Sequence, residues 1–140
     1  MSPTIPIFST HFAMRWSDMD ALGHVNNAMY FTYMEQARIA WFQQLNLGNI
    51  NIQAKEGPIL ANASCTFLKP ILYPNEVTVS ITVNTPGRTS VHTHYHIGVA
   101  GQPDDYAHGE ATIVWMNYLK QQPTPIPPAL RTQLEHAATE

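Results

Sequence analysis

The sequence has few cysteines and few charges. Its single cysteine, Cys65, excludes an intrachain disulfide, so nothing in the fold requires an oxidising compartment. Only 12% of the residues are charged and the net charge at pH 7 is -3, which argues against a general nucleic-acid binder, because such proteins carry a basic face. We expect a surface with so little charge to be partly covered in a homo-oligomer.

The sequence also lacks long apolar runs and several familiar chemical motifs. No segment approaches the roughly 20 apolar residues that cross a bilayer. The stretch from Met1 to Phe12 has neither the basic nor the apolar part of a signal peptide. A Gly-rich phosphate loop and a G-x-S-x-G elbow are both absent. We therefore expect a cytoplasmic protein with no membrane partner, whose chemistry depends on other groups.

A long helix is predicted between residues 28 and 45. Apolar side chains recur there at helical spacing, which predicts one buried stripe. The stripe consists of Tyr30, Tyr33, Met34, Ala37 and Trp41. Asn26 or Asn27 is expected to cap the helix start. The segment 46–48 is expected to end it, with Gly48 in the left-handed conformation.

Strand patterns surround this helix. Apolar and polar residues alternate with a period of two, which predicts half-buried strands, and the short links between the later ones predict antiparallel pairing. The expected strands are 7–16, 61–68, 77–84, 91–97 and 106–116. A second helix is expected at 129–138. With an apolar fraction of 44% and no linker or repeat, residues 1–140 are predicted to form one α+β domain.

The loop before the long helix holds the densest set of reactive groups. Asp18 and Asp20 either solvate and cap the loop or supply a carboxylate for acid–base or nucleophilic chemistry. The chemical role is favoured because Asn26 or Asn27 can already cap the helix, so the aspartates are not needed for capping. Free N–H groups at the helix start could stabilise an oxyanion. His24 either hydrogen-bonds the loop or orients Asp20 or a water molecule.

Three histidines alternate along one predicted strand. Because alternate strand residues share a face, His92, His94 and His96 are expected on one side of the sheet. A metal site would need a further ligand, for which His108 is the candidate, but no established spacing supports it. We favour a polar or subunit-facing surface and expect no metal ion.

Other polar groups carry weaker signals. Glu35 and Arg38 have the spacing of a surface ion pair on a helix. Arg88, Thr89 and Ser90 follow a turn and could hold a phosphate. Cys65 lies within a predicted strand and is expected to pack there, with no histidine partner evident in the sequence.

One motif running from Arg15 to Arg38 is distinctive. It reads R-x-x-D-x-D-x-x-G-H-V-N-N-x-x-Y-x-x-Y-x-E-x-A-R and resembles the 4-hydroxybenzoyl-CoA thioesterase-like branch of the hotdog-fold acyl-CoA thioesterases. The resemblance implies a hotdog fold, in which a five-stranded antiparallel sheet wraps around a long central helix. It also implies a homodimer whose sheets join edge to edge, often within a homotetramer.

The resemblance further implies which residues act in thioester hydrolysis. The second aspartate of the D-x-D pair matches Asp20, which would attack the thioester carbonyl or activate a water molecule. The backbone N–H that polarises the thioester oxygen matches Asn27, and Gly23 provides the bend between them. His24 would play a supporting part, and Tyr30 would lie along the acyl chain. The loop that binds CoA matches 88–90.

The substrate implied is acyl-CoA, and no separate cofactor is expected because CoA is part of the substrate. Leu22 occupies a position where the related acyl-carrier-protein thioesterases have an asparagine, which weakens a carrier-protein assignment. Two alternatives remain open. One is a hotdog hydratase that adds water to an enoyl thioester, and the other is a protein that binds acyl thioesters without hydrolysing them.

Overall fold

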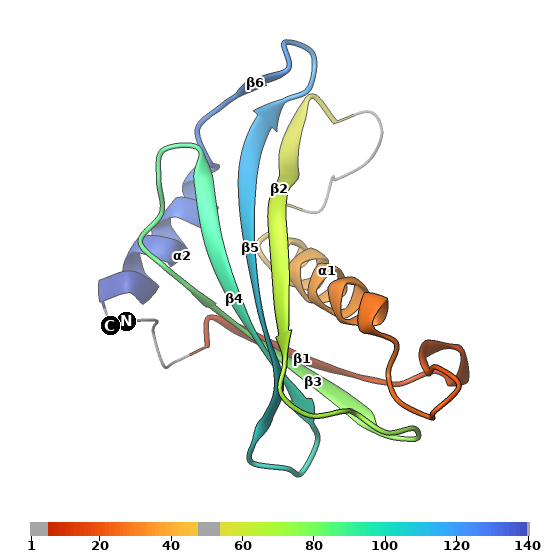
Figure 1. Ribbon diagram of the computed structural model, residues 1–140. Coiled ribbons are helices and arrows are strands. Elements are labelled where there is room, and N and C mark those ends of the chain that lie inside the picture. Colours follow the sequence, from red (N-terminus) through yellow and green to blue (C-terminus); the bar gives the residue numbers. More distant parts are fainter. Residues whose placement is uncertain (1–5, 48–53, 140) are drawn as a thin grey trace.

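The protein is described by a computed structural model in residues 6–47 and 54–139. An antiparallel sheet curves around the long helix α1 (Asn27–Gln44), as Figure 1 shows. The shorter helix α2 (Pro128–Thr139) packs near the end of α1, where Trp41 Nε1 donates a hydrogen bond of 2.9 Å to Gln133 Oε1. This is the arrangement of one sheet around one central helix that the sequence predicts.

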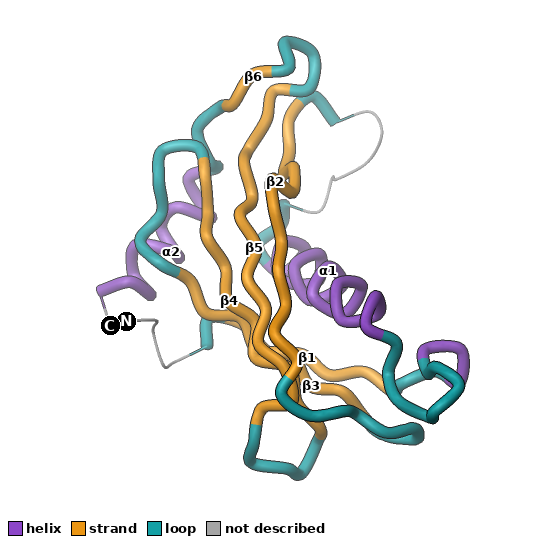
Figure 2. The backbone as a smooth tube through the Cα atoms, viewed as in Figure 1, coloured by secondary structure: helices purple, strands orange, loops and turns teal. Residues whose placement is uncertain are grey.

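The sheet has five main strands, each antiparallel to its neighbours (Figure 2). Their order across the sheet is β1-β3-β4-β5-β2, and the short β6 pairs with β5. The bounds are β1 Phe8–Ala13, β2 Glu56–Phe67, β3 Glu76–Val83, β4 Ser90–Val99, β5 Asp105–Asn117 and β6 Gln122–Pro123. The first strand ends before the predicted residue 16, because the chain turns into a short 3-10 helix at Trp16–Asp18. β2 begins five residues before the predicted residue 61.

The predicted stripe of α1 is confirmed. Its five members are at most 3% exposed: Tyr30, Tyr33, Met34, Ala37 and Trp41. Asn26 caps the helix, and its side-chain oxygen accepts the N–H of Ala28 at 3.0 Å. After the helix, Asn46 takes the left-handed conformation with φ 58°, which asparagine tolerates. The prediction for Gly48 falls outside the described residues.

The two faces of the sheet differ in character. On β4, Tyr95 and Ile97 point to the inner face and are fully buried with β3 residues such as Val79 and Ile81. Because side chains alternate along a strand, His94 and its neighbours two residues away lie on the outer face. The inner face forms the core against α1, whereas the outer face of β4 is lined by imidazoles.

The strand β2 forms one edge of the sheet. It pairs only with β5 among the described strands, and its ladder is interrupted by a bulge at Ala61. Ile59, Leu60 and Phe67 on this strand are 40%, 48% and 44% exposed. A long edge strand with apolar side chains is a template for pairing with another chain.

Candidate active site

The two aspartates before α1 occupy different environments. Asp18 is 2% exposed, and its carboxylate is fully engaged. Oδ2 accepts the backbone N–H of Arg15 at 3.0 Å and the hydroxyl of Tyr33 at 2.9 Å. Oδ1 lies 3.1 Å from the Arg15 guanidinium. Burial and the hydrogen bond to Asp18 raise the pKa of Tyr33, so its hydroxyl remains a donor. Asp18 therefore fixes the start of the loop to the helix.

Asp20 is exposed, and among the described residues only one of its two carboxylate oxygens accepts hydrogen bonds. Its Oδ1 accepts the backbone N–H groups of Leu22 at 2.9 Å and His24 at 3.2 Å. Its main chain closes the same turn, donating to the His24 carbonyl at 2.7 Å and accepting from the Gly23 N–H at 3.1 Å. Gly23 has φ 79°, a conformation that favours glycine. Among the described residues no group donates to Oδ2, so this oxygen is held in place yet available.

The start of α1 lies beside this carboxylate. The N–H of Ala28 is taken by the Asn26 side chain and that of Met29 by the Asn26 carbonyl. Within the described part of the chain, the N–H of Asn27 has no acceptor. A free N–H at the positive end of a helix dipole is a suitable donor for an oxyanion.

Asp20 and Asn27 both line a cleft of about 350 Å³. The cleft lies between the loop, the start of α1 and the segment that follows β2. Its lining residues are Asp20, His24, Val25, Asn27, Tyr30, Phe67, Leu68, Lys69 and Pro70. The structure therefore brings together four residues expected from the sequence, which are Asp20, His24, Asn27 and Tyr30. A second hollow, which also includes Asp20 in its lining, is bordered by the exposed side chains of Trp16 and Leu22.

Apolar residues and one cation complete the lining of the cleft. Tyr30 is buried and meets Phe67 edge-on, with ring centroids 4.9 Å apart. Burial raises the pKa of Tyr30, and a backbone hydrogen bond with Ile71 partly opposes this. The Lys69 ammonium lies 3.2 Å from Asp104 Oδ2 and 4.6 Å from the Tyr106 ring centroid. Lys69 was not predicted from the sequence. The only local feature that could point to it is a lysine placed between the end of a predicted strand and Pro70.

Comparison with known proteins identifies the family of this chain. The family model of the thioesterase-like superfamily matches residues 14–134. The chain belongs to this superfamily. The match includes the loop, α1 and every main strand except β1, so the cleft that contains Asp20 and Asn27 lies within the matched region.

Individual relatives of this thioesterase-like chain cover most of its length. PA2801 of Pseudomonas aeruginosa is 33% identical, with 91% of this chain and 98% of that chain covered and a TM-score of 0.86. A thioesterase from Thermus thermophilus, solved in complex with coenzyme A and Zn, is 30% identical, with coverages of 96% and 97% and a TM-score of 0.77. YsmA of Bacillus subtilis strain 168 is 30% identical over 63% of this chain, which spans 58% of the YsmA length. The predicted hotdog fold is thereby confirmed.

The thioesterase-like chain does not bring the predicted phosphate loop to this cleft. Ser90 pairs with Val114 of β5, whereas the cleft residue Phe67 pairs with Ala107, seven residues away along the same strand. At about 3.3 Å per residue this separation is roughly 23 Å. The Arg88 carbonyl instead accepts the N–H of Ile126 at 3.1 Å. Within one chain, Arg88, Thr89 and Ser90 thus lie at the opposite end of the sheet from Asp20.

The interpretation of Glu35 and Arg38 as a surface ion pair is wrong. Arg38 is only 8% exposed, and its guanidinium donates to the Tyr95 hydroxyl at 3.3 Å. The described residues contain no ion pair between Glu35 and Arg38. The i, i+3 spacing permitted the pair, but the helix turns Arg38 toward the sheet, where an aromatic hydroxyl satisfies it.

Asp18→Asn is expected to lower the free energy of unfolding by about 2–4 kcal/mol, because the amide NH₂ then faces either the Arg15 guanidinium at the Oδ1 position or both the Arg15 N–H and the Tyr33 hydroxyl at the Oδ2 position. Urea unfolding followed by circular dichroism measures this loss. The matched variant Asp20→Asn, which changes an exposed carboxylate two residues away, is expected to unfold like the wild type. Equal stability of the Asp18→Asn variant and the wild type would contradict the structural role of Asp18.

None of the helices in the described part of the chain is long and apolar enough to cross a membrane.

Proposed function

We propose that this protein hydrolyses acyl-CoA thioesters to a free acid and CoA, with Asp20 as nucleophile or general base. One observation carries the proposal. Asp20 Oδ1 is fixed by two backbone N–H groups while Oδ2 is available in the same cleft as the free N–H of Asn27. A positioned carboxylate oxygen and an oxyanion donor are the two groups that cleavage of a thioester requires.

Two routes are compatible with this arrangement. In the first, Asp20 Oδ2 bonds to the carbonyl carbon, the C–S bond breaks, CoA leaves as a thiolate, and water hydrolyses the mixed anhydride. In the second, Oδ2 accepts a proton from a water molecule whose oxygen attacks the same carbon. Either way the carbonyl oxygen gains negative charge, which the Asn27 N–H and the helix dipole stabilise. A thiolate leaves readily because a thiol has a pKa of about 8.5.

The other cleft residues have supporting roles in this proposal. The backbone N–H of His24 holds Asp20, while its ring lines the cleft and is available to orient a water molecule. Tyr30 and Phe67 offer an apolar wall for the acyl group. The Thermus relative solved with coenzyme A supports a CoA ester as the substrate. CoA enters as part of the substrate, so the reaction needs no separate cofactor.

Release of free thiol tests the reaction type. The purified protein is expected to release CoA thiol from at least one member of a panel of short, medium, long and aromatic acyl-CoA esters. A hydratase would consume an enoyl-CoA double bond without releasing thiol. A binding protein would bind acyl-CoA and release none. Either of these last two results across the whole panel would reject thioester hydrolysis.

We also propose a homodimer in which two β2 strands pair edge to edge. The free edge of β2 and its exposed apolar side chains support this assembly, as do Phe31 and Ile39 on α1, which are 40% and 42% exposed. A second copy on this edge would cover the cleft next to Phe67 and shield Asp20 from bulk water. Light scattering coupled to size exclusion is expected to give a dimer or a dimer of dimers, and a monomer at micromolar concentration would contradict this proposal.

The edge-to-edge pairing gives the distant loop a place in the proposed site. When two antiparallel β2 strands pair about a two-fold axis, the Glu56 end of one lies toward the Phe67 end of the other. The loop carrying Arg88 belongs to the Glu56 end of the sheet. We therefore propose that Arg88, Thr89 and Ser90 of the second copy contact the CoA phosphates, while Lys69 contacts them from the same chain as Asp20.

Arg88→Ala and Lys69→Ala are each expected to raise KM for acyl-CoA severalfold and to leave KM for the matching acyl-pantetheine ester nearly unchanged, because the short ester lacks the nucleotide phosphates. Steady-state kinetics with the two esters measures the difference. Equal increases for both esters would reject the phosphate-binding role of that residue.

Mixed dimers separate the two cations. In one mixture, Asp20→Asn subunits are combined with Arg88→Ala subunits. If the arginine acts across the interface, each mixed dimer has one complete site, with Asp20 from the Arg88→Ala subunit and Arg88 from the Asp20→Asn subunit. We expect this mixture to recover a component with wild-type KM. The matched mixture of Asp20→Asn with Lys69→Ala rebuilds no complete site, because the lysine and the remaining aspartate belong to the same chain. Recovery in the second mixture but not the first would reverse the assignment.

A further inference from the structure

The outer face of β4 and β5 carries a dense group of imidazoles and carboxylates. In the sheet register His94 lies opposite Glu110, and His96 lies opposite His108. His92 follows in the same row on β4, next to Thr112 of β5. These side chains point away from α1, and none of them lines the cleft that contains Asp20. The thioesterase proposal therefore gives this cluster no role.

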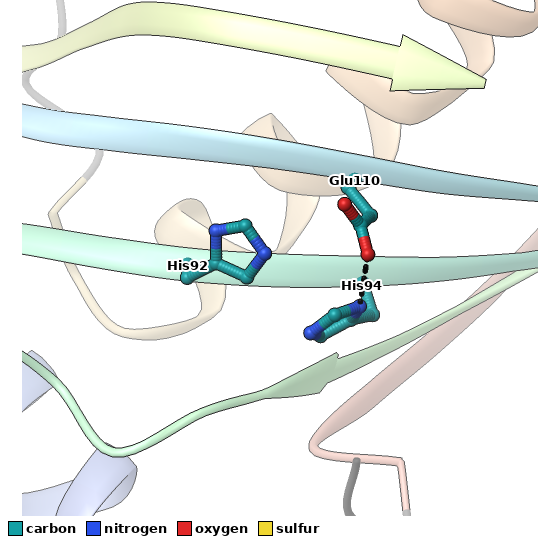
Figure 3. A group of neighbouring side chains, drawn as sticks. All are labelled: His92, His94 and Glu110. Carbon is teal, nitrogen blue, oxygen red and sulfur yellow. Dashed lines mark ion pairs between the residues drawn. The ribbon is translucent and has the colours of Figure 1, made fainter. Parts of the chain in front are cut away.

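Three of these side chains converge, as Figure 3 shows: His92 and His94 from β4 and Glu110 from β5. One ligand atom from each residue lies within 4.8 Å of the others. The rings of His92 and His94 have centroids 4.8 Å apart with an interplanar angle of 72°. In Figure 3 the Glu110 carboxylate faces the His94 ring while the His92 ring stands beside it. One ligand atom of each group is thus close enough to the others for a single ion to reach all three.

The spacing between His94 and Glu110 suits a metal ion. His94 Nδ1 lies 3.4 Å from Glu110 Oε1. That exceeds the 2.7–3.2 Å of an ordinary N–H···O hydrogen bond. In tetrahedral coordination with metal–ligand bonds of about 2.0–2.2 Å, two ligand atoms are separated by roughly 3.4 Å.

Neighbouring polar groups fix which ring nitrogens are free. His94 Nε2 lies 3.2 Å from Asn84 Oδ1, an acceptor, so the proton belongs on Nε2 and the Nδ1 lone pair faces Glu110. His92 Nδ1 contacts Thr112 Oγ1 at 3.1 Å, which leaves Nε2 for a ligand. Histidines that bind metals are held in this way by a partner on their second nitrogen. A lone pair facing a carboxylate is stabilised when a cation lies between them.

A buried hydroxyl lies beside His94 on the neighbouring strand. Thr82 of β3 lies opposite His94 and is 1% exposed. Its Oγ1 has no hydrogen-bond partner among the described residues. The strand next to His94 therefore presents a hydroxyl that the described residues leave without a partner.

We propose that His92, His94 and Glu110 bind one divalent transition-metal ion of the Zn²⁺ type on the outer face of the sheet. Two imidazoles and a carboxylate suit Zn²⁺ or Co²⁺ better than Mg²⁺ or Ca²⁺, which prefer oxygen ligands alone. The ion links β4 to β5 and leaves a fourth position for water. From the sequence we expected no metal and named His108 as the candidate extra ligand, whereas the structure places Glu110 beside His94.

A second group on the same face serves as an internal comparison. Asp105 Oδ2 lies 2.9 Å from His96 Nδ1 and 2.8 Å from His108 Nε2. Burial by itself raises the pKa of Asp105, but the hydrogen bonds from His96 and His108 outweigh it and lower the pKa. These are ordinary hydrogen-bond distances, so all three groups are satisfied without a cation. Variants in this second group are therefore the matched controls.

Isothermal titration with Zn²⁺ tests the proposal. The titrated sample is the full chain from which a chelator has removed any bound metal. The wild type is expected to bind one equivalent. His94→Ala and Glu110→Gln are each expected to weaken binding by at least about a hundredfold, and Asn84→Ala by about 10–100-fold, the range for an outer-shell partner. Glu110→Gln changes a side chain that is 54% exposed, so it remains informative if the His94 variant fails to fold.

The control is a double variant, His96→Ala with His108→Ala, which is expected to bind Zn²⁺ like the wild type. Titration with Co²⁺ gives an independent readout, because four-coordinate Co²⁺ has strong visible absorption that the His94→Ala variant should lose. The proposal is overturned if the wild type binds no Zn²⁺. It is equally overturned if binding disappears in the His96/His108 variant or persists in the Glu110 variant.

Discussion

Asp20→Asn is expected to lower the turnover of acyl-CoA at least about a hundredfold while the protein stays folded. The amide cannot attack the thioester or accept a proton from water, which removes the nucleophile or general base. The amide oxygen can still accept the N–H groups of Leu22 and His24, so the turn is preserved. Thiol release under saturating substrate measures turnover, and thermal unfolding measures stability.

A matched control for this variant is Glu135→Gln. Glu135 is an exposed carboxylate on α2 that pairs with Arg131 at 3.2 Å, and it does not line the cleft. Its partner Arg131 also donates to the Gly87 and Arg88 carbonyls, so the comparison is made at saturating acyl-CoA, where this variant should keep wild-type turnover because neither side chain lines the cleft. Near-normal turnover in the Asp20 variant would remove Asp20 from its proposed role.

The choice between the two aspartates shows where sequence reasoning reaches its limit. The D-x-D spacing places both carboxylates in one loop but does not tell which is buried. That depends on Tyr33, which lies fifteen residues later and donates its hydroxyl to Asp18. The helix stripe was predictable because it arises from a local period, whereas the pairing of Asp18 with the helix depends on how the loop folds back.

Contacts between distant segments account for the remaining differences. Arg38 donates to the Tyr95 hydroxyl, 57 residues away. The helical spacing therefore predicted the wrong partner, Glu35. Lys69 reaches the cleft only because β2 ends beside the helix start. The alternation on β4 predicted a shared face for its histidines, but the identity of Glu110 as their neighbour required the register between β4 and β5.

The start of α1 offers the second prediction with a large effect. Asn27→Pro removes the backbone N–H proposed to stabilise the oxyanion, whereas Asn27→Ala removes only the side chain. Proline is well tolerated at the first position of a helix, and Asn26 has φ -60° and ψ 136°, the extended conformation that a residue before proline adopts. The proline variant is therefore expected to fold with a normal helix start.

Asn27→Pro should lower kcat by about 10²–10³-fold, the loss typical of one oxyanion donor. Asn27→Ala should lose only a small fraction of this, because its N–H is retained. The two variants share the missing amide side chain, so their difference isolates the backbone donor. Kinetics at saturating acyl-CoA, with thermal unfolding to confirm the helix, measures it. If both variants hydrolyse the thioester equally fast, the oxyanion must be stabilised by a group other than the Asn27 N–H.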